Sequence, residues 1–396
     1  MPENTIEETE VENVPFTQYS KSVTFTFLQM AASFGLGCRG VTMNLFDHCG
    51  TPMESHPVMG RMLRKKKRFL DALAERAQRP GALRGVRMLF HPREAYHRRL
   101  PPGAGASALI ADGYPMVLAL ETHGIPVAYG ASETAVAATS GQTLCAFTDE
   151  EIADLLKRGL LLDAVAANTL FERGFGPQLG LQGIEPPVPR SELGPIAAEE
   201  LFHPEFGGAP QRYLTASLPG LSRRVHVSRM DPADGATVVS RLVDPDQEPG
   251  AVALHVFENA LGGRVAVQAY DLATAYGPGY CHPLRAEQLR RVLLWLSRGQ
   301  LPLAIHGPGA HPLGMRHDAT GETLLGFFNL TLDAWDEVTF DLFDEREPAR
   351  LERLSRRGRW KETSKLSAQR REGRLRVTHQ AKATHAAPLF VAVAWK

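Results

Sequence analysis

The feature that most constrains the fold is an alternation of short apolar runs and longer amphipathic segments near the N-terminus. Residues 10–12 end a short strand, 23–34 (VTFTFLQMAASF) have helical spacing, 39–46 (RGVTMNLF) predict a buried strand, and 56–77 predict a second helix. This is the order of repeating β/α units. A closed barrel of such units needs eight strands and about 250 residues. We therefore expect residues 10–80 to form only the last quarter of a (β/α)8 barrel.

The β/α pattern restarts after a linker at residues 79–85 (RPGALRG). The strands expected beyond it cover residues 86–90, 126–129, 143–147 and 160–163. Helical segments separate them, and one begins at Thr148 with a capping box that Glu151 completes. This spacing predicts an open parallel sheet with helices on both faces, as in flavodoxin-like domains.

The rest of this domain, which is expected to end near residue 300, is less regular. Residues 175–219 are rich in Pro and Gly without a sustained period, which indicates a long surface excursion. Strands are expected again at residues 224–230, 237–243, 252–259 and 264–270. Gly262 and Gly263 are expected to supply the positive φ angles of the tight turn between the strands at residues 252–259 and 264–270. An amphipathic helix at residues 284–298 closes the domain.

Residues 301–396 change character. Alternating apolar residues predict antiparallel strands at residues 323–332, 337–343, 374–378 and 389–395. A charged stretch at residues 344–371 is expected to connect two of them. A small β-sandwich fits best. The chain is thus expected to be α/β, with three domains: residues 10–80, 84–300 and 301–396.

Charge balance and cysteine usage limit the classes of partner. The 44 Lys and Arg residues equal the 44 Asp and Glu residues, so no net field attracts nucleic acid or an anionic membrane. No apolar run reaches the roughly 18 residues of a membrane span. The four cysteines form no C-x-x-C pair, the glycines form no G-x-G-x-x-G fingerprint, and the acidic N-terminus lacks a signal-peptide pattern. We expect a cytoplasmic protein with no metal, cofactor, nucleic-acid or membrane partner.

Glu10 and Glu12 are the first candidates for chemistry. They are two positions apart, so on a strand their side chains point to the same side. A retaining glycosidase uses one carboxylate as the nucleophile and a second, protonated carboxyl about 5 to 5.5 Å away as the acid. The alternative is that both residues belong to a frayed acidic tail.

Asn44, Asp47 and His48 follow the second predicted strand. In a barrel, ligands bind at the carboxyl ends of the strands, so these three residues are candidates for binding sugar hydroxyls. The alternative is a loop-capping Asp beside an exposed His. A metal site made of Asp47, His48 and Cys49 is disfavoured, because three adjacent side chains diverge.

The flavodoxin-like segment offers little for nucleophilic catalysis. An amidotransferase or α/β-hydrolase has a G-x-[CS]-x-G elbow after a strand. The segment around Ser132 lacks the second glycine, and Cys145 falls inside a predicted strand, where a buried structural thiol is expected. A hydrolase that uses Ser132 or Cys145 as its nucleophile is therefore a weaker hypothesis than a glycosidase fragment or a non-catalytic binding module.

The segment Glu12-Asn13-Val14-Pro15 resembles the stretch after the seventh barrel strand in the β-galactosidases of glycoside hydrolase family 42. Residues 147–163 are similar to part of that family's middle domain, and the domain order over residues 10–396 resembles the C-terminal portion of its members. The resemblance implies a catalytic barrel, a middle domain and a closing β-sandwich. The middle domain is amidotransferase-like, lacks the amidotransferase nucleophile and mediates trimerisation. The resemblance also implies a carbohydrate substrate, with Glu12 as the nucleophile and Glu10 as the fallback.

The chain departs from this family in one large respect. The first six strands have no counterpart in the sequence, and neither does the acid/base glutamate that follows the fourth. One carboxylate cannot both protonate the leaving group and attack the sugar. We therefore expect a glycosidase fragment that is inactive alone, and that forms a homo-oligomer, such as a trimer, or binds a partner chain that completes the barrel. The alternative is a non-catalytic oligomerisation or carbohydrate-binding module.

Overall fold

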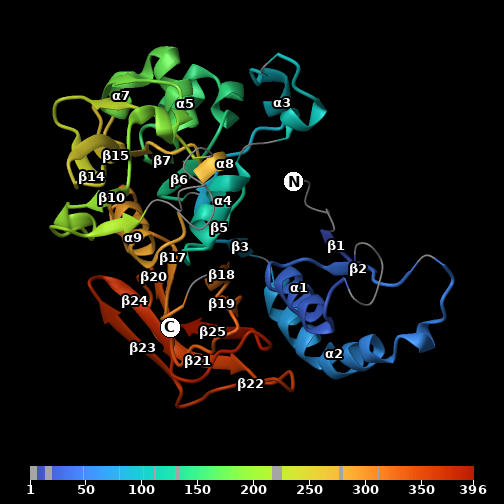
Figure 1. Ribbon diagram of the computed structural model, residues 1–396. Coiled ribbons are helices and arrows are strands. Elements are labelled where there is room, and N and C mark those ends of the chain that lie inside the picture. The colour runs from blue at the N-terminus through green and yellow to red at the C-terminus, as the bar shows by residue number, and fades with distance from the viewer. Residues whose placement is uncertain are drawn as a thin grey trace. The chain divides into compact units, whose positions relative to one another are not determined.

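The computed structural model describes residues 7–13, 20–47, 49–79, 81–100, 102–110, 113–130, 134–215, 225–275, 280–309 and 312–396 (Figure 1). Contacts divide the chain into two compact units. Unit 1 combines Met1–Arg84 with Ile305–Lys396, and unit 2 is the continuous stretch Gly85–Ala304. The division into three domains stays a prediction.

The N-terminal part of unit 1 is a strand–helix–strand–helix segment. Its elements are β1 (Glu8–Glu12), α1 (Val23–Gly35), β2 (Gly40–Asn44), the 3-10 helix η1 (Met53–Ser55) and α2 (Pro57–Ala77). α1 begins after Ser22, whose hydroxyl oxygen accepts a hydrogen bond from the backbone N–H of Phe25. β1 and β2 pair in parallel as a two-stranded sheet. The two predicted helices and the strand within residues 39–46 are confirmed, but the expectation that this strand is buried was wrong, because Thr42 and Met43 are exposed and the rest of β2 is half-buried.

The C-terminal part of unit 1 holds two sheets. Their strands are β3 (Gly81–Leu83), β17 (Leu303–His306), β18 (Pro312–Ala319), β19 (Glu322–Asn329), β20 (Val338–Leu342), β21 (Pro348–Leu354), β22 (Trp360–Lys361), β23 (Leu366–Arg371), β24 (Arg374–His379) and β25 (Leu389–Trp395). One sheet has the order β22-β21-β25-β19-β18-β3, and the other has the order β17-β20-β24-β23. The four strands predicted here are confirmed.

Two further expectations for unit 1 were wrong. The charged connection at residues 344–371 contains three strands. They were not expected because most residues of β21 and β23 are exposed or half-buried, and their charged side chains hide the apolar alternation. The linker at residues 79–85 contains β3, which pairs antiparallel with β18.

One hydrophobic core joins both parts of unit 1. The ring centroids of Phe27 on α1 and Phe69 on α2 are 5.5 Å apart, and those of Phe69 and Phe390 on β25 are 6.2 Å apart. The indole N–H of Trp360 donates to the carbonyl of Ala72 at 3.1 Å. The helices of residues 10–80 therefore cover one face of the six-stranded sheet.

Unit 2 is built on a nine-stranded sheet with the order β11-β10-β14-β15-β16-β7-β6-β4-β5. The parallel strands are β4 (Val86–Met88), β5 (Val127–Ala128), β6 (Val136–Thr139), β7 (Gly159–Leu162) and β16 (Arg264–Gln268). Numbered along the chain, they have the order 2-1-3-4-5, which is that of flavodoxin-like sheets. β10 (Ala198–Leu201), β11 (Tyr213–Thr215), β14 (Thr237–Val243) and β15 (Pro249–Glu258) extend the sheet with antiparallel pairs.

Helices and short strands complete unit 2. The helical elements are α3 (Glu94–His97), η2 (Ala106–Leu109), α4 (Tyr114–Glu121), η3 (Thr143–Ala146), α5 (Asp149–Leu155), α6 (Ala164–Leu170), the π-helical turn η4 (Phe171–Phe175), α7 (Gly176–Leu179), η5 (Arg190–Leu193), η6 (Pro204–Phe206), α8 (Leu272–Ala275) and α9 (Pro283–Leu296). The short strands are β8 (Leu181–Ile184), β9 (Val188–Pro189), β12 (His226–Val227) and β13 (Met230–Pro232). The predicted capping box of Thr148 and Glu151 is present at the start of α5.

Three expectations for unit 2 were wrong. Residues 143–147 form the 3-10 helix η3 and not a strand, and the third parallel strand is β6, which is short and made of small residues. The expected surface excursion at residues 175–219 contains β10, which is buried although its sequence is AEEL. In the β15–β16 turn only Gly262 has a positive φ angle; at Gly263 a Cβ atom would lie 2.0 Å from the carbonyl oxygen of Leu156.

Within the residues that the structure describes, no helix is both long and apolar enough to cross a bilayer.

Candidate functional site

The predicted site begins on β1, where apolar and acidic side chains alternate. Val11 is 3% exposed and belongs to the same core as Phe27 and Met30 of α1. Glu10 and Glu12 are exposed and point to the opposite side, as two residues spaced by two on a strand must. In a closed barrel, the side of the strand away from the helices is the interior.

The carboxyl ends of β1 and β2 lie side by side. Glu12 and Asn44 are the last residues of their strands and are partners in the parallel register. The Asn44 amide donates to the Glu12 carboxylate over 3.4 Å, a long contact. The Nζ of Lys21 donates to the backbone carbonyl of Glu12 and, at 2.6 Å, to the side chain of Gln29.

Asn13 ties the two strand ends together and was not assigned a role from the sequence. It is 3% exposed. Its backbone N–H donates to the Asn44 carbonyl at 3.0 Å, and its side-chain amide donates to the Leu45 carbonyl at 3.1 Å. These bonds fix the position of Glu12 relative to Asn44. No signal in the sequence predicted these bonds, because they depend on the register of β1 and β2. Val14 and Pro15 lie outside the described residues.

The loop after β2 contains Asp47 and His48. His48 lies outside the described residues. Asp47 accepts a hydrogen bond from the backbone N–H of Cys49 at 3.0 Å, as an Asp that closes a turn does. Hydrogen bonds from the Thr51 side chain and the Cys49 backbone lower the pKa of Asp47, which favours its ionised form. A role for Asp47 in sugar binding stays a prediction.

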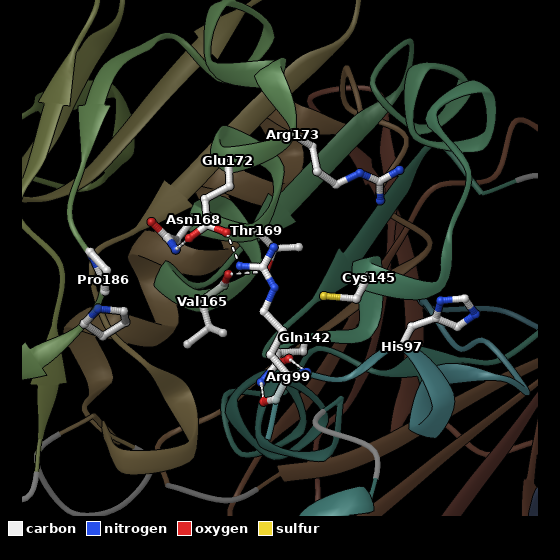
Figure 2. A pocket seen from close by; sticks show the side chains of 11 residues that line it. His97, Arg99, Gln142, Cys145, Val165, Asn168, Thr169, Glu172, Arg173 and Pro186 are labelled. Carbon is white, nitrogen blue, oxygen red and sulfur yellow. Dashed lines mark hydrogen bonds and ion pairs between the residues drawn. The ribbon is translucent and has the colours of Figure 1, made fainter. Parts of the chain in front are cut away.

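In unit 2, Cys145 lies on η3 and lines a cavity of about 340 Å³ (Figure 2). The thiol is half-buried, and burial raises its pKa, so the reactive thiolate is disfavoured. Ser132 lies outside the described residues. The geometry gives no support to a hydrolase that uses Cys145 as its nucleophile.

A buried charged network in unit 2 was missed from the sequence. Glu199 on β10 is fully buried and forms an ion pair with Arg285 on α9, which is 2% exposed. Ser240 donates to the same carboxylate at 2.6 Å and Tyr270 donates at 2.8 Å. The ring of Tyr280 lies 4.8 Å from the Arg285 guanidinium. Tyr270 and Tyr280 are therefore packed inside unit 2.

No group of His, Cys, Asp and Glu side chains in the described part of the chain is arranged to hold a metal ion.

Solved structures resemble this chain over nearly its whole length. The β-galactosidase from Bacillus circulans sp. alkalophilus matches with a TM-score of 0.56 and 12% identity, over 94% of this chain and 52% of that one. Gan42B, a GH42 β-galactosidase, matches with a TM-score of 0.50 and 10% identity, over 94% and 51%. A catalytic mutant of Gan42B from G. stearothermophilus gives the same TM-score and identity over 95% and 51%. The fold is GH42-like.

The GH42-like fold accounts for only part of each neighbour, because this chain spans about half the length of the β-galactosidases it matches. Neither a protein-family model nor a curated sequence matches the chain. At 10 to 12% identity the likeness concerns the fold. The roles of individual residues have to be argued from their own geometry.

Proposed function

We propose that this chain is the C-terminal part of a retaining glycoside hydrolase related to the family 42 β-galactosidases, with residues 10–80 as the last quarter of its (β/α)8 barrel. One observation carries the proposal. Glu12 and Asn44 are paired residues at the carboxyl ends of two parallel strands, and helices cover the opposite side of β1. Barrel enzymes place their catalytic groups at this end of the strands.

In this proposal Glu12 is the nucleophile, with Glu10 as the fallback. The carboxylate attacks the anomeric carbon, the bond from that carbon to the leaving oxygen breaks, and a glycosyl ester forms. The amide of Asn44 orients the Glu12 carboxylate, and Asn13 holds the two strand ends in register. Asn44, Asp47 and His48 would contact the sugar hydroxyls.

The acid that protonates the leaving group must come from elsewhere. Asp47 accepts hydrogen bonds that lower its pKa, so it is a poor proton donor. Glu10 lies two residues before Glu12 on the same exposed side of the same strand, so it does not face Glu12 across a bound sugar. We therefore propose that six further barrel strands, carried by another polypeptide segment or chain, supply the acid/base glutamate, and that residues 10–396 alone do not turn over substrate.

The test is hydrolysis of an aryl β-galactoside by the purified chain, with and without the product of the adjacent upstream reading frame. We expect turnover only with both, and loss of that turnover in Glu12→Gln. Glu10→Gln is the matched control and should retain activity. A 2-fluoro galactoside with a good leaving group should label Glu12 as an ester detected by peptide mass. Turnover by the chain alone that Glu12→Gln leaves unchanged would contradict the proposal.

A second candidate function is a non-catalytic oligomerisation or carbohydrate-binding module. Exposed aromatic and aliphatic side chains between β4 and β5 favour it, among them Phe90 (61% exposed), Tyr96 on α3 (86%) and Ile110 (69%). Under this alternative the chain forms a homo-oligomer, such as a trimer, and binds galactose without hydrolysing aryl galactosides. Sedimentation velocity of wild type against Tyr96→Ser tests for this interface. Galactose binding without aryl galactoside hydrolysis, with the upstream product present, separates this function from the first.

None of the four cysteines, all of which lie within the described residues, forms a disulfide bond. Free thiols are typical of a reducing compartment, which supports the proposed cytoplasmic location.

A further inference from the structure

The cavity beside Cys145 lies where doubly wound sheets bind ligands. His97 and Arg99 follow β4, and Gln142 and Cys145 follow β6. These two strands are neighbours in the sheet, but the chain leaves β4 toward β5 on one side and β6 toward β7 on the other. Ligands of such sheets bind in the crevice outside the carboxyl ends of the strands at this switch point. The cavity belongs entirely to unit 2 and is independent of the proposed glycosidase site.

Guanidinium groups outnumber carboxylates on the wall of this cavity. Arg99 and Arg173 line it, against one carboxylate, that of Glu172. Both oxygens of Glu172 are already engaged: one accepts from Arg99 and the other accepts from the amide of Asn168 at 3.0 Å. A ligand would therefore meet mainly donors, which favours an anion.

The guanidinium of Arg99 can release its ion-pair partner Glu172 and bind an anionic ligand in its place. The backbone of Arg99 is clamped by Gln142, which accepts from the Arg99 N–H at 2.7 Å and donates to the Arg99 carbonyl at 3.1 Å. Its side chain extends toward Glu172, as Figure 2 shows, yet it is 78% exposed and its partner is 41% exposed. An ion pair this exposed contributes little stability, so an incoming anion can displace Glu172 at small cost.

The other residues that line the cavity indicate the size and polarity of the ligand. Arg173 is held in place by the Leu144 carbonyl, to which it donates at 3.0 Å, and by an ion pair with Asp149. Val165, Pro186 and Pro187 supply apolar surface beside these polar groups. A cavity of about 340 Å³ holds a molecule of the size of a monosaccharide derivative.

We propose that this cavity binds a small organic anion, a carboxylate or phosphate group on a polar carbon skeleton, with the anionic oxygens on Arg99 and Arg173. Carboxylate and phosphate share the chemistry of accepting hydrogen bonds from guanidinium groups. The site gives unit 2 a binding function that is separate from hydrolysis.

Isothermal titration of the full chain tests this site with galactose 6-phosphate, galacturonate and inorganic phosphate, and with neutral galactose as the control. We expect saturable binding of at least one organic anion, weakened by salt, and none of galactose. The tighter of the two organic anions identifies the anionic group. Absence of saturable binding by both organic anions at concentrations up to about 10 mM, or equal binding of galactose, overturns the proposal.

Two variants with opposite expected effects keep the test sharp. Arg99→Gln should weaken anion binding roughly tenfold, because it removes charged hydrogen bonds. Glu172→Gln should tighten binding several-fold, because it removes the carboxylate that competes for Arg99. Lys157→Gln is the matched control: this exposed lysine pairs with Asp154 at 2.7 Å outside the cavity, and its loss should leave binding unchanged. Binding that Arg99→Gln leaves unchanged, or that Glu172→Gln weakens, overturns the assignment.

Discussion

Replacing Glu199 with Gln tests how strongly unit 2 depends on its buried ion pair. One oxygen of Glu199 accepts from Arg285 at 3.0 Å and from Ser240 at 2.6 Å. The other oxygen accepts from Tyr270 at 2.8 Å and from a second nitrogen of Arg285. Glu199→Gln keeps the size of the side chain but leaves the guanidinium buried without a counter-charge.

The expected cost is large. Removing one partner of a buried ion pair typically destabilises a protein by 3 to 5 kcal/mol. The amide oxygen of Gln still accepts one or two of the hydrogen bonds, so we expect the lower end of that range. A loss of about 3 kcal/mol raises the opening constant of unit 2 roughly 150-fold.

Hydrogen exchange measured by mass spectrometry on peptides from β10, β16 and α9 is the direct assay. Glu258→Gln is the control, because Glu258 also pairs with arginines, at 2.9 Å, but is exposed. A loss below about 1 kcal/mol for Glu199→Gln, or one no larger than that of the control, would refute the reasoning.

The same network predicts a pH dependence. Burial alone would raise the pKa of Glu199, but the charge of Arg285 and the hydrogen bonds from Arg285, Ser240 and Tyr270 outweigh burial and lower it. A depressed carboxyl pKa stabilises the fold above the unfolded-state value near 4.3, and this contribution is lost as the pH falls through the folded value. Wild type and Glu199→Gln should therefore converge in stability only at strongly acidic pH.

Three further substitutions in unit 2 have defined outcomes. Burial lowers the pKa of His255 to about 4, so between pH 6.5 and 4 the unfolded chain binds a proton at His255 and the folded chain does not. The free energy of unfolding of the wild type should therefore fall by up to about 3 kcal/mol over this range. His255→Leu, which removes the hydrogen bond to the Leu179 carbonyl, should lower stability at pH 7 but flatten that slope in urea titrations. Gly180→Ala should cost about 2 to 4 kcal/mol, because φ is +67° and the new Cβ would lie 2.5 Å from the ring of Phe257. Gly174→Ala has a similar φ of +88° but open space, so thermal melting should show only about 1 kcal/mol of strain; equal losses in both would contradict the clash.

Local signals in the sequence were reliable where they act alone. The capping box of Thr148 and Glu151 and the helical apolar spacing of residues 23–34 and 56–77 predicted their helices closely. β10 was missed, because Glu199 and Glu200 mark an exposed segment by composition. Glu199 is buried only because Arg285, 86 positions further on, neutralises it. No periodicity in the sequence reports a pair of that kind.

The candidate site was predicted in part. The placement of Glu12 and Asn44 at the ends of neighbouring strands follows from the β/α order, and the structure shows the two in contact. The hydrogen bonds of Asn13 depend on the register of the two strands, which the sequence did not specify. The cavity beside Cys145 was not foreseen, because four separate segments of the chain contribute its walls.

Unit 1 is assembled from the two ends of the chain, and this sets the order of events on the ribosome. β3 (Gly81–Leu83) has to wait for its partner β18 (Pro312–Ala319) while all of unit 2 is translated. At 5 to 20 residues per second this delay is roughly 10 to 50 s. During that interval the apolar faces of α1 and α2 lack the sheet that later covers them, whereas unit 2 can fold as soon as it emerges. Nascent chains arrested before β18 should therefore bind chaperones through their first 80 residues.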